Sequence, residues 1–254
     1  MSSAGTVRPG RIRLDELLVA QGLASNRAEA ARLILAGQVR LPGGLVAKAG
    51  RLVPPDTTVE RVAPMPFVGR GGEKLEAALV ALGVSVAGRV CLDVGASTGG
   101  FTDCLLQRGA ARVYAVDVGR GQLDAKLRND ARVSVREKVN ARSLSREHVP
   151  ETVWLATIDV SFISLKLVLP AVVPLVEKNG FIVVLVKPQF EAGRSEVGKG
   201  GIVRSPEVRQ RVVREVEDLG AALGLGLAGS IASPIRGAHG NEEFLLSFRV
   251  NSSQ

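Results

Sequence analysis

The chain of 254 residues is poor in cysteine, histidine and aromatic residues, and each shortage excludes a class of protein. Two cysteines are too few for a disulfide framework, and because Cys91 and Cys104 form no C-x-x-C pair, we interpret both as reduced core residues. His148 and His239 lack the spacing of metal ligands, so we predict no metal site. One Trp, one Tyr and seven Phe are too few for a single-strand channel lined with stacking rings.

Long apolar runs are also missing. The longest, 167–176 and 180–186, are far shorter than the roughly 20 residues of a membrane-spanning helix, so we predict no membrane span. Residues 1–10 are polar and basic and do not form a secretory signal, which predicts a flexible tail. Together with the reduced cysteines, this indicates a cytoplasmic protein.

Basic and apolar residues are abundant. Against 25 Asp and Glu, 33 Lys and Arg give a net charge of +8 and a pI near 10.1. Such a charge favours an anionic partner, either nucleic acid or a membrane surface. The hydrophobic fraction of 46% can build a real core, and the length allows one large domain or one large and one small domain.

A glycine-rich turn at 93–100 is the most informative feature of the chain. It lies between an apolar run and a predicted helix, as in a nucleotide-binding element. The spacing of Gly95 and Gly99 departs from the G-x-G-x-x-G of dinucleotide sites, and an acidic residue precedes the first glycine. This pattern suits a positively charged ligand without pyrophosphate, such as S-adenosylmethionine. The residues expected to bind this cofactor are Asp93, Gly95, Ala96, Ser97, Thr98, Gly99, Gly100 and Phe101.

Asp117 ends the next predicted strand, 112–117. In doubly wound sheets, a carboxylate that accepts hydrogen bonds from a ribose lies at about this distance along the chain from the glycine-rich turn. We therefore add Asp117 to the expected cofactor site, with a turn or cap role as the alternative.

Residues 73–250 alternate predicted strands and helices. Such alternation predicts an α/β domain with a mostly parallel, Rossmann-like sheet that is covered on both faces. Ligands of these sheets bind beyond the carboxyl ends of the strands, which is where Asp93, Asp117, Asp159 and Lys187 fall. For Lys187, a solvated strand end is the alternative. The strands are predicted at 89–95, 112–117, 132–138, 154–159, 181–187, 227–232 and 243–250, and the clearest helices at 73–82 and 206–223.

Residues 11–64 are predicted to form a separate small α+β module, joined by a linker at 65–72. A helix at 13–23, a second helix after Ser25, and short extended segments around a turn at 42–44 leave a basic face. The excess of Arg over acidic residues favours phosphate contact over an ordinary solvated surface. The residues expected to contact RNA here are Arg13, Arg27, Arg32 and Lys48.

This module resembles the S4 RNA-binding domain. The matching residues are Arg13-Leu14-Asp15, Gly22-Leu23, Ser25-x-Arg27-x-x-Ala30 and Ile34-x-x-Gly37-x-Val39. The resemblance implies that its two-helix face binds structured RNA.

Five further motifs follow in order along the larger domain: Gly69–Leu75, Asp93–Thr102, Asp159–Leu165, Val186–Glu191 and Gly240–Phe244. With them the domain resembles the 2'-O-ribose RNA methyltransferases of the FtsJ-like class. The whole chain is similar to the TlyA family, which joins an S4-type domain to such a methyltransferase and is often named haemolysin. The resemblance implies a Rossmann-like fold that uses S-adenosylmethionine, and a catalytic tetrad of Lys74, Asp159, Lys187 and Glu243.

The resemblance also implies the substrate, a cytidine ribose in 23S rRNA, with 16S rRNA as a second candidate and ribosomal subunits as partners. Lys187 is the expected general base, because a ribose hydroxyl attacks poorly until its proton is removed. Methylation at a cytosine carbon fits less well, since neither cysteine ends a strand. Methylation of an exocyclic amine also fits less well, because Asp159-Val160-Ser161-Phe162 lacks the expected prolines.

The segment 191–204 is long, glycine-rich and basic and directly follows the strand of Lys187. We expect an RNA-facing lid, with a plain flexible loop as the alternative. The residues expected to contact RNA from the larger domain and the linker are Arg70, Arg194, Lys199 and Arg204.

Two other functions stay open. A membrane-active haemolysin, which the family's name suggests, is disfavoured by the missing signal, membrane span and strongly amphipathic helix. A ribosome-binding factor without catalysis is disfavoured by the complete tetrad and cofactor turn. The sequence does not define the target nucleotide, the subunit or the oligomeric state.

Overall fold

The computed structural model describes residues 10–35, 38–42, 47–62, 66–237 and 240–251. Contacts divide the chain into two compact units, Met1–Pro66 and Phe67–Gln254. The predicted tail except Gly10, part of the predicted turn at 42–44, Gly37 and His239 lie outside the described residues.

The smaller unit packs two helices against short paired strands. Leu14, Leu18 and Ala30 are almost completely buried at the centre of its core. The first helix ends earlier than predicted, because the chain turns at Gln21 and Gly22 takes a left-handed conformation with φ of 69°. The elements are α1 (Leu14–Ala20), α2 (Arg27–Leu35), and the antiparallel pairs β1 (Ile12–Arg13) with β3 (Leu52–Val53) and β2 (Val39–Arg40) with β4 (Glu60–Arg61).

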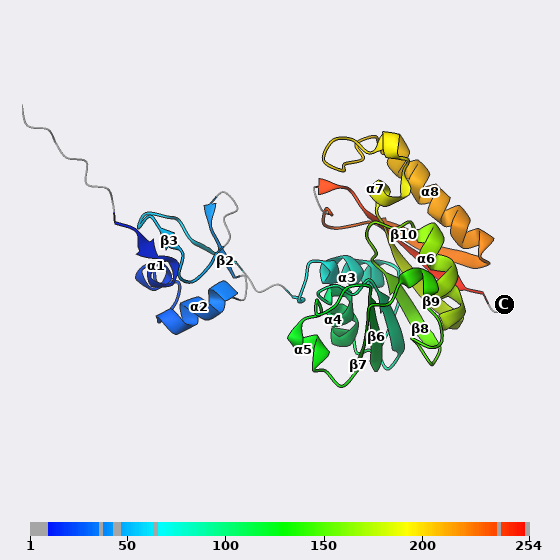
Figure 1. Cartoon of the computed structure of the whole chain (residues 1–254), viewed down its shortest axis with the longest axis horizontal. Helices are drawn as coiled ribbons and strands as arrows, with labels where there is room; N and C mark the ends of the chain where they lie inside the picture. Colours follow the sequence, from blue (N-terminus) through cyan, green and yellow to red (C-terminus); the bar gives the residue numbers. More distant parts are fainter. Residues whose placement is uncertain (1–9, 36–37, 43–46, 63–65, 238–239, 252–254) are drawn as a thin grey trace, which may run out of the picture. The chain divides into compact units, whose positions relative to one another are not determined.

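The larger unit is built on a seven-stranded sheet with the order β10-β11-β9-β8-β5-β6-β7 (Figure 1). The neighbours from β9 to β7 run parallel, whereas β11 is antiparallel to both β9 and β10. The predicted, mostly parallel α/β sheet is thus confirmed. Its strands are β5 (Val90–Val94), β6 (Arg112–Asp117), β7 (Val133–Glu137), β8 (Val153–Ile158), β9 (Val176–Val186), β10 (Leu225–Ala232) and β11 (Phe244–Val250).

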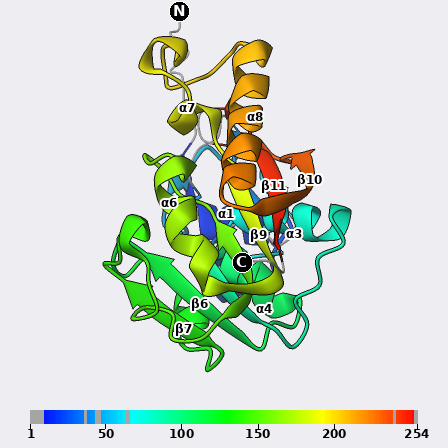
Figure 2. The same cartoon turned by 90° about the vertical axis from the view of Figure 1, so that its right-hand side faces the viewer.

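Helices cover both faces of this sheet because successive strand residues are apolar and point to opposite sides. Leu92 and Val94 pack with residues of α6 and α8, whereas Cys91 packs on the other face with residues of α3 and α4. Helices α6 and α3 lie on opposite sides of the sheet (Figure 2). The helices are α3 (Gly71–Ala81), α4 (Gly100–Gln107), α5 (Ala125–Arg128), α6 (Leu165–Val172), α7 (Pro188–Glu191) and α8 (Pro206–Ala222), with 3-10 turns η2 (Ala141–Ser143), η3 (Val173–Leu175) and η4 (Arg194–Glu196).

Strand β9 and the glycine-rich segment after α7 also differ from the sequence prediction. Strand β9 begins at Val176 rather than at 181, because Val176 pairs with Val153 while the polar residues that follow it stay at the solvent-exposed end of the strand. The glycine-rich segment after α7 contains η4 and a bridge between Gly198 and Ile202, so part of it has regular hydrogen bonding.

Residues 67–72, expected to form a linker, pack with the larger unit. Phe67 is buried in the same apolar cluster as residues of α3 and α4. The backbone N–H of Val68 donates to Asp103 Oδ2 at 2.9 Å. A Cβ atom on Gly72 would lie only 2.3 Å from the Phe67 ring, so this approach requires glycine. The segment therefore lies directly beside the start of α4.

Candidate functional site

The carboxyl ends of β5 and β8 flank the point at which the strand order reverses. From β5 the chain proceeds to β6 and β7 on one side and then returns to β8 on the other. Such a reversal leaves a crevice in open α/β sheets. A cavity of about 490 Å³ lies there, within the roughly 300–1,000 Å³ typical of small-molecule sites. Its lining includes Gly95, Ser97, Asp117, Val118, Gln122, Asn140, Arg142, Asp159, Ser161 and Phe162.

The turn between β5 and α4 is shaped by two glycines in left-handed conformations. Gly95 has φ of 87°, and a Cβ atom there would lie 2.3 Å from the carbonyl oxygen of Asp159. Gly99 has φ of 100° at the N-cap of α4, where a Cβ atom would meet Leu127 at 2.2 Å. The predicted glycine-rich turn therefore lies tightly between the end of β8 and the start of α4. Ser97 and Thr98 are exposed on it, whereas Ala96 and Phe101 are buried.

Asp117 accepts hydrogen bonds from the backbone N–H groups of Ser97 at 2.8 Å and Gly119 at 2.7 Å. It thus orders the glycine-rich turn, which was the alternative role considered for it. Asp117 also lines the larger cavity, and a carboxylate has lone pairs for further donors. Both the turn role and the predicted ligand role are compatible with this geometry.

Asp93 lies behind the turn and is fully buried. Its carboxyl accepts hydrogen bonds from the hydroxyls of Thr102 at 2.7 Å and Thr157 at 3.2 Å. Burial raises the pKa of Asp93 to about 7, and the nearby charge of Asp159 acts in the same direction, while the threonine hydrogen bonds oppose both. Among the described residues, those that line the two cavities at this edge do not include Asp93. It supports the turn from beneath.

A second, smaller cavity of about 230 Å³ adjoins the first. Gly95, Ser97 and Asp159 line both cavities, so the Asp159 side chain lies at their boundary. The rest of its lining comes from the start of α3, from the turn before α4 and from the loop before β11. These residues include Gly69, Arg70, Gly71, Lys74, Thr98, Gly100, Phe101 and Gly237.

The four residues of the expected tetrad form two ion pairs at this edge. Lys74 Nζ donates to Glu243 Oε2 at 2.5 Å, with both side chains buried. Lys187 Nζ lies 2.5 Å from Asp159 Oδ1 and donates to Ser161 Oγ at 3.0 Å. Charges that leave water are tolerated when each has a close partner, which both pairs provide.

Glu243 is seated by the backbone in front of β11. A Cβ atom on Gly237 would lie 1.8 Å from Glu243 Oε1, so a larger residue at this position would displace the Glu243 carboxylate. Gly237 and Lys74 line the smaller cavity, and Asp159 lines both cavities. Through these neighbours the structure brings together Lys74 of α3, Asp159 and Lys187 directly after β8 and β9, and Glu243 directly before β11.

Ser161, Phe162 and Asn140 belong to the site but were not predicted from the sequence. Phe162 is 89% exposed, has φ of 64°, and its ring centroid lies 5.0 Å from that of Phe190. No sequence pattern predicts that a phenylalanine will adopt a left-handed backbone conformation. Asn140 follows strand β7, so applying the strand-end rule to that strand would have found it.

Neither cysteine has the chemistry of a nucleophile. Cys91 and Cys104 are completely buried. Burial raises the pKa of the Cys91 thiol to about 12 and raises that of Cys104 well above its ordinary value. Both stay protonated near neutral pH, as the prediction of core residues requires. Among the described residues, no group of three or more His, Cys, Asp and Glu side chains is arranged to hold a metal ion.

The basic residues expected to contact RNA fall into three groups. In the smaller unit, Arg13 and Arg27 both pair with the buried Asp15, at 2.8 Å and 3.4 Å, whereas Arg32 and Lys48 are exposed. Arg70 is exposed and lines the smaller cavity. The third group, on the segment between α7 and α8, is exposed and consists of Arg194, Lys199 and Arg204.

Known proteins share this architecture. The FtsJ-like methyltransferase family matches residues 67–250, and the S4 domain matches residues 12–59. A Mycobacterium tuberculosis protein named 16S/23S rRNA (cytidine-2'-O)-methyltransferase TlyA is 48% identical over 246 residues, 96% of this chain and 92% of that protein. Hemolysin A of Brachyspira hyodysenteriae is 42% identical over 240 residues, 94% of this chain and 100% of its own.

A solved structure, "Putative hemolysin from Streptococcus thermophilus", has a TM-score of 0.74 and 42% identity, covering 97% of this chain and 90% of its own. The fold and the site together define an α/β methyltransferase. The chain belongs to the FtsJ-like methyltransferase family and carries an S4 domain at its N-terminal side. Every helix in the described ranges is too short or too polar to cross a lipid bilayer.

Proposed function

We propose that this protein transfers a methyl group from S-adenosylmethionine to the ribose 2'-hydroxyl of a cytidine in ribosomal RNA. The observation that carries the proposal is the Lys187–Asp159 pair, 2.5 Å apart, with Asp159 at the boundary of two adjoining cavities. Two adjoining cavities give each of two reactants a place beside this pair. The name of the Mycobacterium tuberculosis relative supports RNA and the ribose as the substrate.

The larger cavity suits the cofactor. Asp117 and Asp159 line it, and their carboxylates can accept hydrogen bonds from ribose hydroxyls and attract a positively charged sulfur. The turn at Gly95 leaves the backbone open where a Cβ atom would clash, so a ligand can approach closely. When bound, S-adenosylmethionine supplies a methyl group on sulfonium sulfur that an oxygen nucleophile can accept.

The tetrad prepares the RNA hydroxyl. Lys187 Nζ, when neutral, accepts the proton of the 2'-hydroxyl, and Asp159 and Ser161 hold that nitrogen in place. The Lys74–Glu243 pair lies at the smaller cavity, where it orients the ribose. Much of the acceleration comes from positioning the reactants.

RNA binding is shared by both units in this proposal. The S4 unit, proposed to span 11–64, offers Arg13, Arg27, Arg32 and Lys48, and a methyltransferase unit, proposed to span 73–250, offers Arg194, Lys199 and Arg204. Each is a phosphate contact that holds the RNA without reading its sequence. Ribosomal RNA as the substrate also agrees with the expected cytoplasmic location.

The test is a methylation assay with radiolabelled S-adenosylmethionine and each undermodified ribosomal subunit, followed by digestion to nucleosides. Wild-type protein should label 2'-O-methylcytidine. Lys187→Ala should lower the rate by about 100-fold or more, because a general base contributes on the order of 10²–10⁴-fold. Binding of S-adenosylmethionine should be intact in this variant.

The matched control is Lys178→Ala, which removes an exposed lysine from the opposite end of the same strand, β9. Its rate should equal that of the wild type. Absence of label on both subunits with the wild type, or loss of cofactor binding in Lys187→Ala, would contradict the proposal. Lysis of red cells that survives Lys187→Ala would separate any haemolysis from methylation.

A further inference from the structure

Two chain segments leave the sheet side by side at the site. One runs from Asp159 at the end of β8 to the start of α6, and the other runs from Lys187 at the end of β9 through α7. The first link between them is the Lys187 Nζ contact with Asp159 Oδ1 at 2.5 Å, supported by Ser161 Oγ at 3.0 Å. The second is the ring contact of Phe190 with Phe162.

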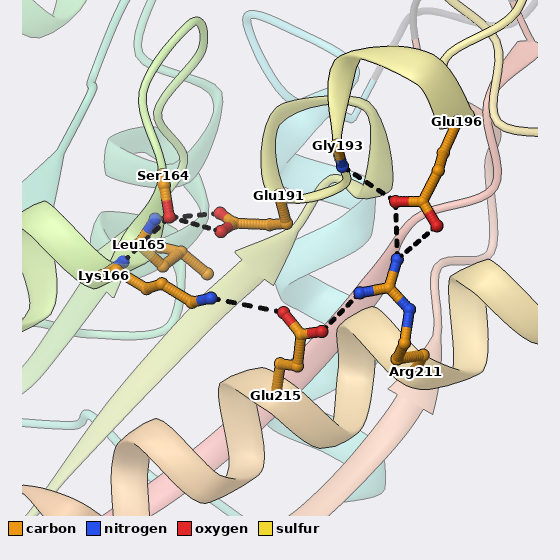
Figure 3. Close-up of polar contacts among 8 residues, drawn as sticks. All are labelled: Ser164, Leu165, Lys166, Glu191, Gly193, Glu196, Arg211 and Glu215. Carbon is orange, nitrogen blue, oxygen red and sulfur yellow. Dashed lines mark hydrogen bonds and ion pairs between the residues drawn. The ribbon is translucent and has the colours of Figure 1, made fainter.

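Glu191, the last residue of α7, makes the third link (Figure 3). Its Oε2 accepts a hydrogen bond from Ser164 Oγ at 2.6 Å, and its Oε1 accepts one from the backbone N–H of Leu165 at 2.8 Å. Ser164 is the N-cap of α6, and its Oγ also accepts from the backbone N–H of Lys166 at 3.2 Å. The carboxylate therefore sits on the N-terminus of α6, where a negative charge is favourable.

The turn that Glu191 holds is strained. Phe162 has φ of 64°, a left-handed conformation that residues other than glycine, asparagine and aspartate rarely adopt. Such a conformation persists only when the surrounding contacts hold it. Phe190 and Glu191, neighbours on α7, contact the turn at Phe162 and at Ser164, on its two sides. Ser161, the residue that contacts Lys187 Nζ, immediately precedes Phe162.

Ion pairs beyond Glu191 connect the same segments through α8 (Figure 3). Glu196 of η4 accepts from Arg211 at 2.6 Å, Arg211 also pairs with Glu215 at 2.5 Å, and Glu215 accepts from Lys166 of α6 at 3.3 Å. These side chains are all at least 31% exposed, and exposed ion pairs contribute little individually. Glu191, in contrast, is half-buried. Its burial raises the pKa of the carboxyl group, and the hydrogen bonds from Ser164 and Leu165, which act in the opposite direction, offset this only in part.

We propose that Glu191 is a positioning residue for methyl transfer, which holds the 161–164 turn against α7 and thereby keeps Lys187 Nζ beside Asp159. This inference rests on the proposed function, because Glu191 acts through Lys187 and lines neither of the two cavities. It assigns the carboxylate of the Val186–Glu191 motif a task separate from that of its lysine.

The test compares Glu191→Ala, Glu191→Gln and the control Glu147→Gln, which changes an exposed glutamate before β8. Steady-state methylation gives kcat and the KM for the RNA, and equilibrium binding gives the Kd for S-adenosylmethionine. For Glu191→Ala, kcat should fall by about 10-fold or more, because misplaced reacting groups cost on the order of 10²-fold at a displacement of 1 Å. KM and Kd should stay within about twofold of the wild type, as for a lost positioning contact.

Glu191→Gln keeps an acceptor oxygen and the side-chain shape, so it should recover part of kcat. Glu191→Ala and Ser164→Ala should be non-additive in kcat, because they remove the same hydrogen bond. The control should match the wild type.

An unchanged kcat in Glu191→Ala would overturn the inference, and so would a parallel change of kcat, KM and Kd, which indicates general damage. If Glu191→Ala does not fold, Glu191→Gln is the deciding variant. A fall in kcat with unchanged KM and Kd supports the inference. A kcat equal to that of the wild type, or a fall in kcat accompanied by changes in KM and Kd, overturns it. A wild-type protein that labels no ribose refutes the proposed function instead, so the two failures are distinguishable.

Discussion

At the scale of single residues, Asp93 is the side chain whose charge the fold changes most clearly. It is completely buried between two threonine hydroxyls, and its pKa is raised from 3.8 to about 7. A carboxyl group at this position keeps its proton in the folded protein at a pH where the unfolded chain has lost it. The stability of the protein should therefore depend on pH through this one residue.

The sign follows from proton uptake. Below about pH 4 both states hold the proton, and between about pH 4 and pH 7 only the folded state holds it. The free energy of unfolding therefore falls as pH rises through this window, by at most about 1.4 kcal/mol per pH unit, and the penalty is complete above about pH 7. Asp93→Asn removes this dependence while its amide can still bond both threonine hydroxyls.

Urea unfolding at pH 5, 6, 7 and 8 measures the effect. From pH 5 to pH 8, the free energy of unfolding of the wild type should fall by about 2 kcal/mol or more relative to that of Asp93→Asn. Parallel stability profiles for the two proteins would show that Asp93 does not bind a proton in the folded state.

The places of individual site residues were only partly predictable. Asp159 and Lys187 end apolar strands, so the strand-end rule brought them to one edge, where they are 2.5 Å apart. Lys74 and Glu243 follow no local pattern, and only the family resemblance indicated them. Their contact joins residues separated by 169 positions, which local sequence reasoning does not reach. Phe162 was missed because a positive φ depends on the neighbours of the turn.

At the scale of elements, the turn from β5 to α4 depends on what lies against Gly95. A side chain there would both disfavour φ of 87° and collide with the carbonyl oxygen of Asp159 at 2.3 Å. Because the clash is with backbone, relief requires the turn or the end of β8 to move. Gly95→Ala should therefore weaken S-adenosylmethionine binding by about 10-fold or more, which calorimetric titration would measure.

Gly88→Ala is the matched control for that change. Gly88 has φ of 69°, and a Cβ atom there would meet no atom within 4 Å, so it shares the conformational cost without the collision. That cost is on the order of 1 kcal/mol of stability. Equal affinities in Gly95→Ala and the wild type would mean that the cofactor does not use this turn.

The elements that carry their own end signals were predicted well. Helix α8 begins at Pro206 as expected, because Ser205 caps it by accepting the N–H of Val208. Strand β9 was predicted too short because its polar start resembles a turn. Its true beginning is set by pairing with Val153, which is distant in the sequence. Local signals fix helix ends better than they fix strands, whose limits depend on a partner.

At the scale of the whole molecule, the two units have separate apolar cores, and both carry exposed basic residues. With a net charge of +8, the chain should bind RNA largely by releasing counterions. The proposed RNA contacts of the smaller unit are unequal. Arg13 and Arg27 already pair with Asp15, whereas the described part of the chain offers Arg32 and Lys48 no acidic side chain within ion-pair distance.

Arg32 and Lys48 should therefore contribute most to the salt dependence of RNA binding by this unit. Arg32→Ala and Lys48→Ala should each weaken binding to a ribosomal subunit and reduce the slope of log K against log salt by about 0.7–0.9. Lys178→Ala should leave the slope unchanged. Filter binding at 50–200 mM salt measures these slopes. Methylation at saturating RNA should be unaffected in both variants, because these side chains belong to the unit without the tetrad. A slope equal to that of the wild type in both would show that phosphate contacts lie elsewhere on the protein.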